Sequence, residues 1–247
     1  MAGHSKWKQI KRKKAVTDAR RGAHFTKLIK EITMAAKAGG GNPAGNARLR
    51  LAIDTAKAAN MPADNIERAV KKGTGELEGV NYEDVTYEGY GPGGAAILVE
   101  CTTDNPNRTV ADLRNIFSKG GGNLGTAGSV AWMFDKRGQI AVDATRYGED
   151  ATMEVALDAG AVDFAREGDS YIVSTEIAAF HAVQEALKAK SIAWESAEIA
   201  MIPKSTVKVE GGAAAQLVKL MEAIEDHDDV AKVFSNFDVD EEALAGV

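Results

Sequence analysis

The spacing of the apolar residues changes near Tyr82, and the change limits what the chain can fold into. Before Tyr82 apolar residues recur every three or four positions, as on one face of a helix; after it, segments in which they alternate or form short runs, as in strands, are interspersed with helical ones. Of the 247 residues 45% are hydrophobic, which is enough for more than one core. We therefore expect a helical N-terminal domain followed by domains that contain sheets.

The N-terminal part of the sequence predicts three helices after a basic arm. The first helix carries its apolar face at Phe25, Leu28, Ile29, Ile32 and Ala36 and stops at the glycines 39–41. A second helix begins after Asn46, a good N-cap residue, and a third follows Pro62, which suits a first turn. The arm and the helices together form the first expected domain, residues 1–79.

Residues 136–203 contain the complete order of a ferredoxin-like domain, which is strand, helix, strand, strand, helix, strand. Its first strand is expected at residues 139–142. The sequence on either side predicts two strands around a Gly/Pro turn, a helix at 108–119, a strand at 130–134, a helix at 213–224 and a strand at 230–234. Neither side completes a sheet with two helices by itself, so the two sides are expected to join.

The expected fold class is therefore α+β with three domains. A helical domain (residues 1–79) precedes two ferredoxin-like α/β domains. The third domain (residues 136–203) is inserted in the second, which is formed by residues 80–135 and 204–247. In this arrangement each sheet covers one face with two helices.

Charge is divided unevenly along the chain. The whole sequence has a net charge of −6, yet residues 1–72 hold 17 Lys and Arg against 5 Asp and Glu, and the rest holds 13 against 31. Such segregation is typical of a module that binds polyanions and is attached to acidic domains. The sequence therefore predicts nucleic acid as the partner of the first domain.

The candidate binding residues are basic side chains near the N-terminus, with one tryptophan among them. They are Lys6, Trp7, Lys8, Lys11, Arg12, Lys13, Lys14, Arg20 and Arg21, followed on the first helix by Lys27 and Lys30. The cations can neutralise phosphates, and an indole ring can stack on a base. A solubilising tail is the alternative, but a tryptophan in such a run has no core to justify it.

A second group of residues is predicted to make secondary contacts. It contains cations of the second and third helices and part of a glycine-rich loop, namely Arg48, Arg50, Lys71, Lys72, Gly121, Gly122 and Asn123. The second and third helices could form a helix-turn-helix, although similar residues lie on the outside of any small helical bundle. Backbone N–H groups of the glycine-rich loop could approach a phosphate, and a flexible connection is the alternative interpretation.

Catalytic, cofactor and metal sites find little support in the sequence. The four histidines are scattered, and no two have the spacing of metal ligands. Residues 89–94 match the G-x-G-x-x-G pattern, but a strand follows them where a dinucleotide site needs a helix, so a hairpin turn with glycines at positive φ is expected. We predict no catalytic residue, no metal, no cofactor and no small-molecule substrate.

The single cysteine and the hydropathy indicate the compartment. Cys101 lies in an apolar run and is interpreted as a small buried hydrophobe, which excludes an intramolecular disulfide and fits a reducing compartment. No stretch approaches 18 apolar residues, and no apolar segment follows the basic N-terminus, so neither membrane insertion nor secretion is expected. The prediction is a cytoplasmic protein without a membrane partner.

Five segments of the sequence together resemble the YebC family. They are MAGHSKW (1–7), FTKLI (25–29), YEGYGPGG (87–94), DNPNRT (104–109) and GGNLGTAGS (121–129). The resemblance spans the whole chain and implies a helical domain followed by two α/β domains. It also implies DNA binding, because members are named probable transcriptional regulators, while other relatives include a mitochondrial translational activator that acts at the ribosome. The resemblance assigns no catalytic residue.

Three functions are consistent with these features. The leading hypothesis is a non-enzymatic, nucleic-acid-binding regulator of gene expression, specifically a DNA-binding transcriptional regulator. The first alternative is a translation factor or translational activator that binds the ribosome through its RNA, because duplex phosphates and ribosomal RNA attract the same lysines. The second alternative is an enzyme that uses a cleft between the inserted and the parent domain, although the sequence shows no convergent set of polar residues for one.

Overall fold

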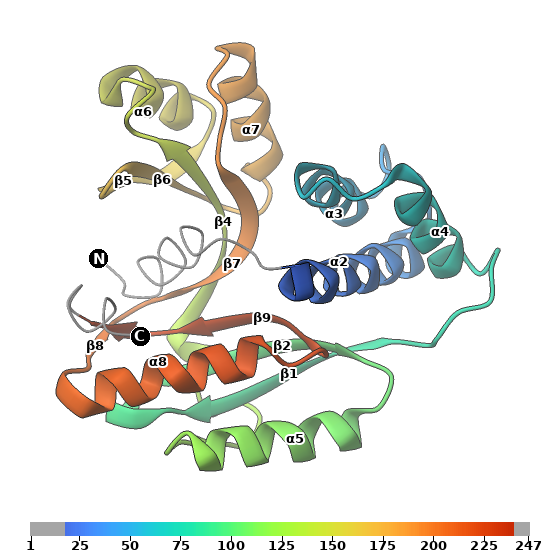
Figure 1. Cartoon of the computed structure of the whole chain (residues 1–247). Coiled ribbons are helices and arrows are strands. Elements are labelled where there is room, and N and C mark those ends of the chain that lie inside the picture. Colours follow the sequence, from blue (N-terminus) through green and yellow to red (C-terminus); the bar gives the residue numbers. More distant parts are fainter. Residues whose placement is uncertain (1–17, 240–247) are drawn as a thin grey trace.

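The structure is a computed structural model that describes the backbone of residues 18–239 and the side chains of residues 22–239. It contains three domains, a helical one and two that combine an antiparallel sheet with helices (Figure 1). The predicted fold class, α+β with the third domain inserted in the second, is confirmed. The residue bounds predicted for each domain remain a proposal.

The helical domain consists of α2 (Asp18–Gly39), α3 (Ala47–Ala58) and α4 (Ala63–Thr74). Asn46 caps α3 as predicted, because its side-chain oxygen accepts a hydrogen bond from the Leu49 N–H. The amide group of the same side chain donates to the carbonyls of Ala35 and Gly40 and thereby fastens the start of α3 to the end of α2. The apolar faces of the three helices meet in one core around Ile32 and Leu49, both fully buried.

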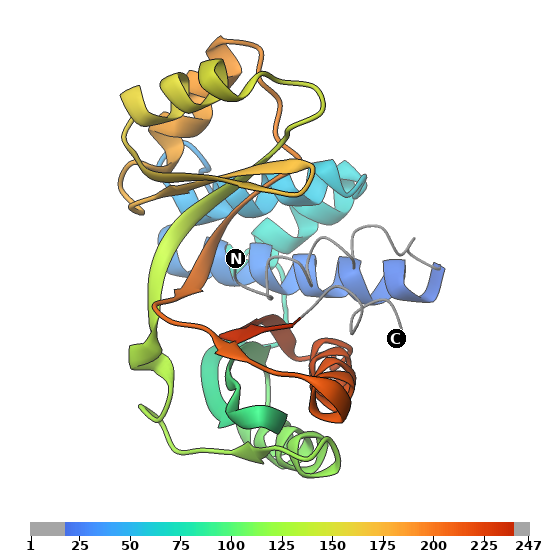
Figure 2. The same ribbon diagram turned by 90° about the vertical axis from the view of Figure 1, so that its left-hand side faces the viewer.

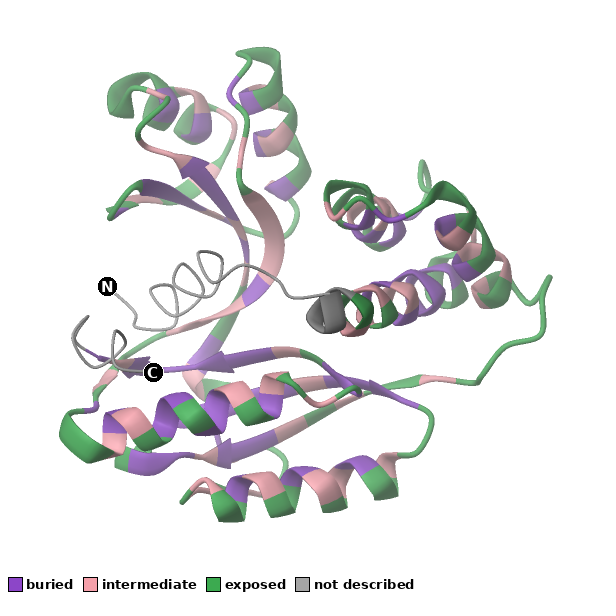
Figure 3. Ribbon diagram, in the orientation of Figure 1, coloured by how far each residue is buried: buried purple, intermediate pink, exposed green. Residues whose placement is uncertain are grey.

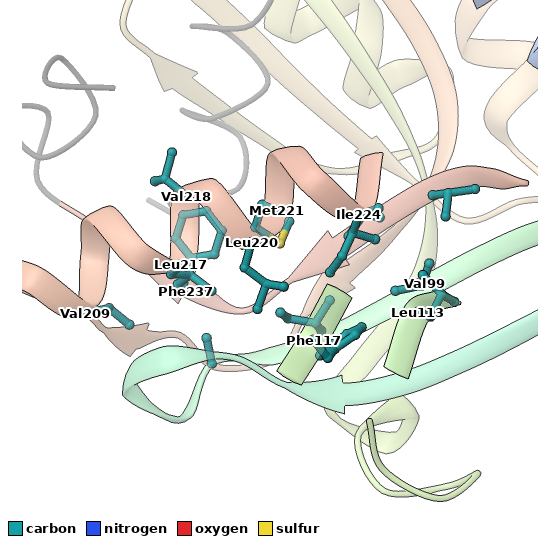
Figure 4. Close-up of a cluster of buried hydrophobic side chains, with 14 of the residues drawn as sticks. Val99, Leu113, Phe117, Val209, Leu217, Val218, Leu220, Met221, Ile224 and Phe237 are labelled. Carbon is teal, nitrogen blue, oxygen red and sulfur yellow. The ribbon is translucent and has the colours of Figure 1, made fainter. Parts of the chain in front are cut away.

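The second domain is a four-stranded antiparallel sheet with two helices on one face. Its elements are β1 (Glu83–Tyr90), β2 (Ala96–Thr103), α5 (Pro106–Lys119), β3 (Asn123–Leu124), α8 (Gly211–Glu225) and β9 (Val230–Ser235), and the strand order is β3-β1-β2-β9. Phe117 of α5 and Leu217 of α8 pack with Val99 of β2 in the main core (Figure 4). Two short strands, β8 (Val207–Lys208) and β10 (Phe237–Asp238), pair in parallel beside this core.

The third domain has the predicted order of elements. These are β4 (Phe134–Asp143), α6 (Glu149–Asp158), β5 (Ala161–Glu167), β6 (Ser170–Thr175), α7 (Phe180–Ala189) and β7 (Ser196–Pro203), arranged in the sheet as β5-β6-β4-β7. The four strands of the second domain are arranged in the same way in space. Its strand β1 has the place that β6 has in the third domain, but β1 comes before β2 in the chain, whereas β6 comes after β4 and β5. Both domains are thus ferredoxin-like, and only the third shows the usual order in sequence.

Strands β4 and β7 connect the second and third domains. They pair from Ala141↔Ser196 down to Phe134↔Pro203, and Figure 2 shows them rising from one domain into the other. At their lower end Phe134 and Ala200 pack against Leu98 and Phe234, on the face of the second sheet that α5 and α8 leave open. The buried segments in Figure 3 continue across this joint, so the two domains share an apolar contact in addition to their connecting strands.

One predicted strand is absent at its expected place. Residues 130–134 were expected to form a strand and residues 139–142 another, but a single strand, β4, begins at Phe134, and Ala131–Met133 form a 3₁₀ turn, η2. The backbone N–H groups of Val130 and Ala131 donate to the carboxylate of Glu88 and are therefore not available for a sheet. A buried carboxylate thus converts the start of the expected strand into a turn.

A close crossing of two helices provides a test of the helical domain. A Cβ atom at Gly73 would lie 2.3 Å from the Thr33 carbonyl oxygen and 2.7 Å from the Ala36 Cβ, so Gly73→Ala must push α4 away from α2. We expect this variant to lose about 1–3 kcal/mol of unfolding free energy, measured by urea denaturation. Gly45→Ala is the matched control, because its nearest contact would be an ordinary 3.9 Å. Equal stability of the two variants would contradict the close crossing.

Candidate nucleic-acid interface

Most of the predicted arm lies outside the described residues. This applies to Lys6, Trp7, Lys8, Lys11, Arg12, Lys13 and Lys14. Arg20 and Arg21 belong to the first turns of α2, which begins at Asp18, and only their backbone is described. Their predicted contacts with nucleic acid therefore remain proposals, and the described structure shows what the rest of the helical domain contributes.

Two predicted binding residues on α2, Lys27 and Lys30, face the second domain. The Lys27 ammonium donates a hydrogen bond to the carbonyl of Glu225, at the end of α8. The Lys30 ammonium donates to the Asp229 carboxylate at 2.8 Å and to the Asp228 carbonyl at 3.0 Å, and only 8% of Lys30 is exposed. Lys30 is therefore an interdomain contact in this structure, and its predicted contact with nucleic acid remains a proposal.

Asp229 is the centre of a buried polar cluster between the two domains. Besides Lys30, the side chains of Arg108, Thr109 and Thr103 donate to its carboxylate, at 2.9, 2.8 and 3.2 Å. Burial alone would raise the pKa of Asp229, but the hydrogen bonds from Lys30, Arg108 and Thr109 hold this pKa well below its usual range. The carboxylate is consequently charged at neutral pH and joins α2, α5 and β9.

Three of the four cations of α3 and α4 that were expected to make secondary contacts have partners within the protein. Arg48 forms a two-pronged contact with Glu31 and an ion pair with Asp84 of β1, so it also links the first two domains. Lys71 pairs with Glu67 at i,i+4, and the Arg50 guanidinium lies 3.4 Å from the Pro43 carbonyl. Lys72 is exposed. The described helical surface therefore offers partly neutralised cations.

The glycine-rich loop after α5 is ordered by an internal carboxylate. Glu88, of which 7% is exposed, accepts hydrogen bonds from the backbone N–H groups of Gly128, Val130 and Ala131 at 2.6 to 2.8 Å. Burial would raise the pKa of Glu88, yet these backbone hydrogen bonds lower it. These N–H groups form an anion-binding site, and the carboxylate of Glu88 occupies it.

The three predicted contact residues of this loop lie at its beginning. Gly121 is exposed and has a positive φ of 76°. Gly122 packs so closely that a Cβ would lie 2.4 Å from the Tyr90 carbonyl oxygen, and Asn123 pairs with Tyr90 in the sheet. Gly122 therefore has a structural role, because the absence of a side chain lets its backbone pack directly against the backbone of Tyr90.

Sequence reasoning missed the two buried carboxylates, Glu88 and Asp229. Asp229 is the last residue of the acidic segment 225–229, which resembles a charged, exposed helix end. The sequence therefore does not indicate that the Asp229 side chain is buried. One signal was available for Asp229, because the residue directly precedes the apolar strand β9. Glu88 follows Tyr87 in a strand, and nothing in its neighbours indicates that loop N–H groups surround it.

The glycine-rich segment 89–94 and Cys101 both have structural roles. Gly89 and Tyr90 end β1, and residues 91–95 form the predicted turn to β2, with positive φ at Gly93 and Gly94. Cys101 is buried, and its burial raises the pKa of the thiol to about 12, so it is an unreactive core residue as predicted.

Within residues 18–239 no group of three or more His, Cys, Asp or Glu side chains could hold a metal ion. No helix in this part of the chain has the length and apolarity needed to cross a membrane.

The fold and the charge pattern together define a three-domain α+β protein with a basic helical domain at its N-terminus. Residues 5–76 match the family model described as the TACO1/YebC protein N-terminal domain, and residues 82–237 match that of the TACO1/YebC second and third domain. The chain therefore belongs to the TACO1/YebC family, which confirms the resemblance seen in the sequence.

Named relatives and a solved structure cover nearly the whole chain. A probable transcriptional regulatory protein of Gemmatimonas aurantiaca is 59% identical over 99% of both chains, and one of Geobacter sulfurreducens is 57% identical over 99% of this chain and 98% of its own. The crystal structure of a conserved hypothetical protein from Aquifex aeolicus is similar with a TM-score of 0.84 and 46% identity, and the match covers 90% of this chain and 92% of that one.

The Asp229 cluster generates a test of the contact between the first two domains. Asp229→Asn leaves Lys30 buried without a countercharge, and we expect it to lower the unfolding free energy by about 3 kcal/mol at pH 7, measured by urea denaturation. Asp228→Asn is the control, because the Asp228 side chain is exposed and only its backbone carbonyl contacts Lys30. A comparable loss in both variants would show that the cluster does not hold the domains together.

The same cluster predicts a pH dependence. The pKa of Asp229 is lower in the folded chain than in the unfolded chain, where the pKa of an aspartate side chain is about 4. Its stabilising contribution is therefore complete above about pH 4 and is lost as the pH falls toward the folded pKa. The difference in stability between the wild type and Asp229→Asn should accordingly shrink on acidification below about pH 4.

Proposed function

We propose that this protein is a non-enzymatic, nucleic-acid-binding regulator of gene expression that acts in the cytoplasm and binds DNA through its basic N-terminal arm. The observation that carries the proposal is the charge pattern, with eight Lys and Arg between Lys6 and Arg21 in a chain that is acidic as a whole. The names of its relatives, probable transcriptional regulatory proteins, support regulation as the function.

The described contacts support the arm as the main binding element. Lys27 and Lys30 bind groups of the second domain, and Arg48 is paired with Glu31 and Asp84. A cation whose partner lies in another domain gains less from a phosphate, because that interdomain contact must be broken first. The contacts of Arg50 and Lys71 lie on the exposed surface of the helical domain and are weak. We therefore assign phosphate contacts to the arm and to Arg20 and Arg21, with Arg50, Lys71 and Lys72 as secondary contacts.

A second candidate function is a translation factor or translational activator that binds ribosomal RNA. The specific feature in its favour is Trp7, which lies among the cations of the arm. An indole ring stacks on unpaired bases, which RNA loops offer and an intact DNA duplex does not. In this proposal the arm would use the same lysines for phosphates and Trp7 for a base.

The salt dependence of binding tests the arm. Each neutralised phosphate contributes about −0.9 to the slope of log K against log salt on a duplex, so replacing Lys11, Arg12, Lys13 and Lys14 by Ala should flatten the slope by about three to four units. The measurement is fluorescence anisotropy with a labelled duplex between low and physiological salt. Sequence preference should be modest, because phosphate contacts carry no sequence information.

The matched control for this variant removes four exposed cations from the acidic domains and so changes the net charge equally. These are Arg146, Lys188, Lys190 and Lys219. The control should keep the wild-type slope. An unchanged slope in the arm variant would move the electrostatic contact to the secondary residues Arg50, Lys71 and Lys72.

Sedimentation separates the two candidate functions. If the target is DNA, the protein should remain at the top of a sucrose gradient of cell extract after nuclease has digested the messenger RNA. Comigration with ribosomal subunits after that treatment would replace DNA by ribosomal RNA as the target. The arm variant is the control for a specific association, since it should lose whichever interaction the wild type shows.

A further inference from the structure

Trp132, in the turn η2, has the most exposed side chain among the large apolar residues that the structure describes. It is 65% exposed, more than Val80, Val162 or Ile177. A tryptophan can bury about 150–250 Å² of surface, so an indole left in solvent forgoes a large stabilising contribution. Such a residue is a candidate for contact with another molecule.

The backbone that carries Trp132 is held firmly on both sides. Val130 is fully buried and Phe134 is 4% exposed, and both pack in the joint between the second and third domains. The backbone N–H groups of Val130 and Ala131 bind Glu88, as described above. The buried neighbours and the Glu88 carboxylate therefore hold this turn, to which the indole ring adds a single hydrogen bond.

The ring itself has a fixed direction. Its Nε1–H donates a hydrogen bond to the carbonyl of Ser129 at 3.2 Å, and the same carbonyl accepts a hydrogen bond from the Tyr90 hydroxyl. The Lys204 ammonium donates to the Trp132 carbonyl at 2.9 Å. A ring that is already oriented loses little conformational entropy on binding, which is the property of a preformed contact surface.

The segments bonded to the turn of Trp132 are small and polar and include one exposed ion pair. The segment bonded to Ser129 contributes the exposed residues 126–128 (Thr, Ala, Gly), and the segment that follows β7 contributes Lys204 and the exposed residues 205–206 (Ser, Thr). The Lys204 ammonium also lies 3.4 Å from the Asp135 carboxylate, and about half of each side chain is exposed. An exposed ion pair of this kind is weak, so Lys204 can also meet an anion.

We propose that Trp132 is a stacking platform for an unpaired base of a nucleic acid, with Lys204 as the neighbouring cation that meets an adjoining phosphate. Base stacking on an aromatic ring next to cations is a recurrent mode of binding single strands. A protein partner would be expected to require a wider apolar patch, because the centre of a protein interface is depleted of charged residues. The proposal rests on nucleic-acid binding as the proposed function and adds a second contact, on the domain joint.

The test uses the full-length chain with Trp132 as its single tryptophan, obtained by Trp7→Phe and Trp194→Phe. A 12-nucleotide oligothymidylate and a 12-nucleotide oligouridylate are titrated separately, so that the DNA and RNA arms are compared directly. Stacking predicts quenching of the Trp132 emission on binding. In the otherwise wild-type chain, Trp132→Ala should weaken the affinity about tenfold, while Trp132→Phe, which keeps an aromatic face, should retain most of it.

The outcomes separate this inference from the proposed function. Thermal unfolding of Trp132→Ala should match the wild type, since the ring is exposed. If the arm variant loses affinity while Trp132→Ala binds like the wild type and the emission is unquenched, the platform is refuted and the proposed function stands. If the wild type binds neither oligonucleotides nor duplexes, both fail. Unchanged oligonucleotide binding together with Trp132-dependent capture of a protein would overturn the assignment of a base as the ligand.

Discussion

The position of the helical domain depends on one buried carboxylate, that of Asp229. It lies directly before β9 and binds Lys30 of α2 and Arg108 of α5, so three elements from two domains meet at it. A buried carboxylate is costly unless it is paired, and a buried lysine equally so, which makes each of these residues dependent on the other. The acidic second domain thereby binds a cation of the basic first domain, and Arg48 with Asp84 repeats this pattern nearby.

The helices and the order of the strands could be predicted because they depend on local patterns. The cap at Asn46, the glycine-rich turn after β1 and the six elements of the inserted domain all follow from residues close in sequence. The turn η2 could not be predicted in this way. Val130, Trp132 and Phe134 alternate as in a strand and would share one face, but Glu88, more than 40 positions earlier, binds the N–H groups of this segment.

The candidate interface was harder to predict than the fold. Lys27 and Lys30 were predicted to bind nucleic acid, which requires the face of α2 that carries them to be open. In a protein of several domains that outer face can instead contact a neighbour, and Lys27 and Lys30 do so. Periodicity separates the core face of a helix from the other faces, but it carries no information on which of those faces another domain covers.

The two buried carboxylates restrict where a nucleic acid can bind. Asp229 occupies the donors of Lys30 and Arg108, and Glu88 occupies the N–H groups of the glycine-rich loop, all of which would otherwise attract a phosphate. A polyanion that approached either place would have to displace an internal carboxylate, which would then be left buried without a partner. In our proposals, binding is therefore directed away from the domain contacts and toward the N-terminal arm and the ring of Trp132, one suited to phosphates and the other to a base.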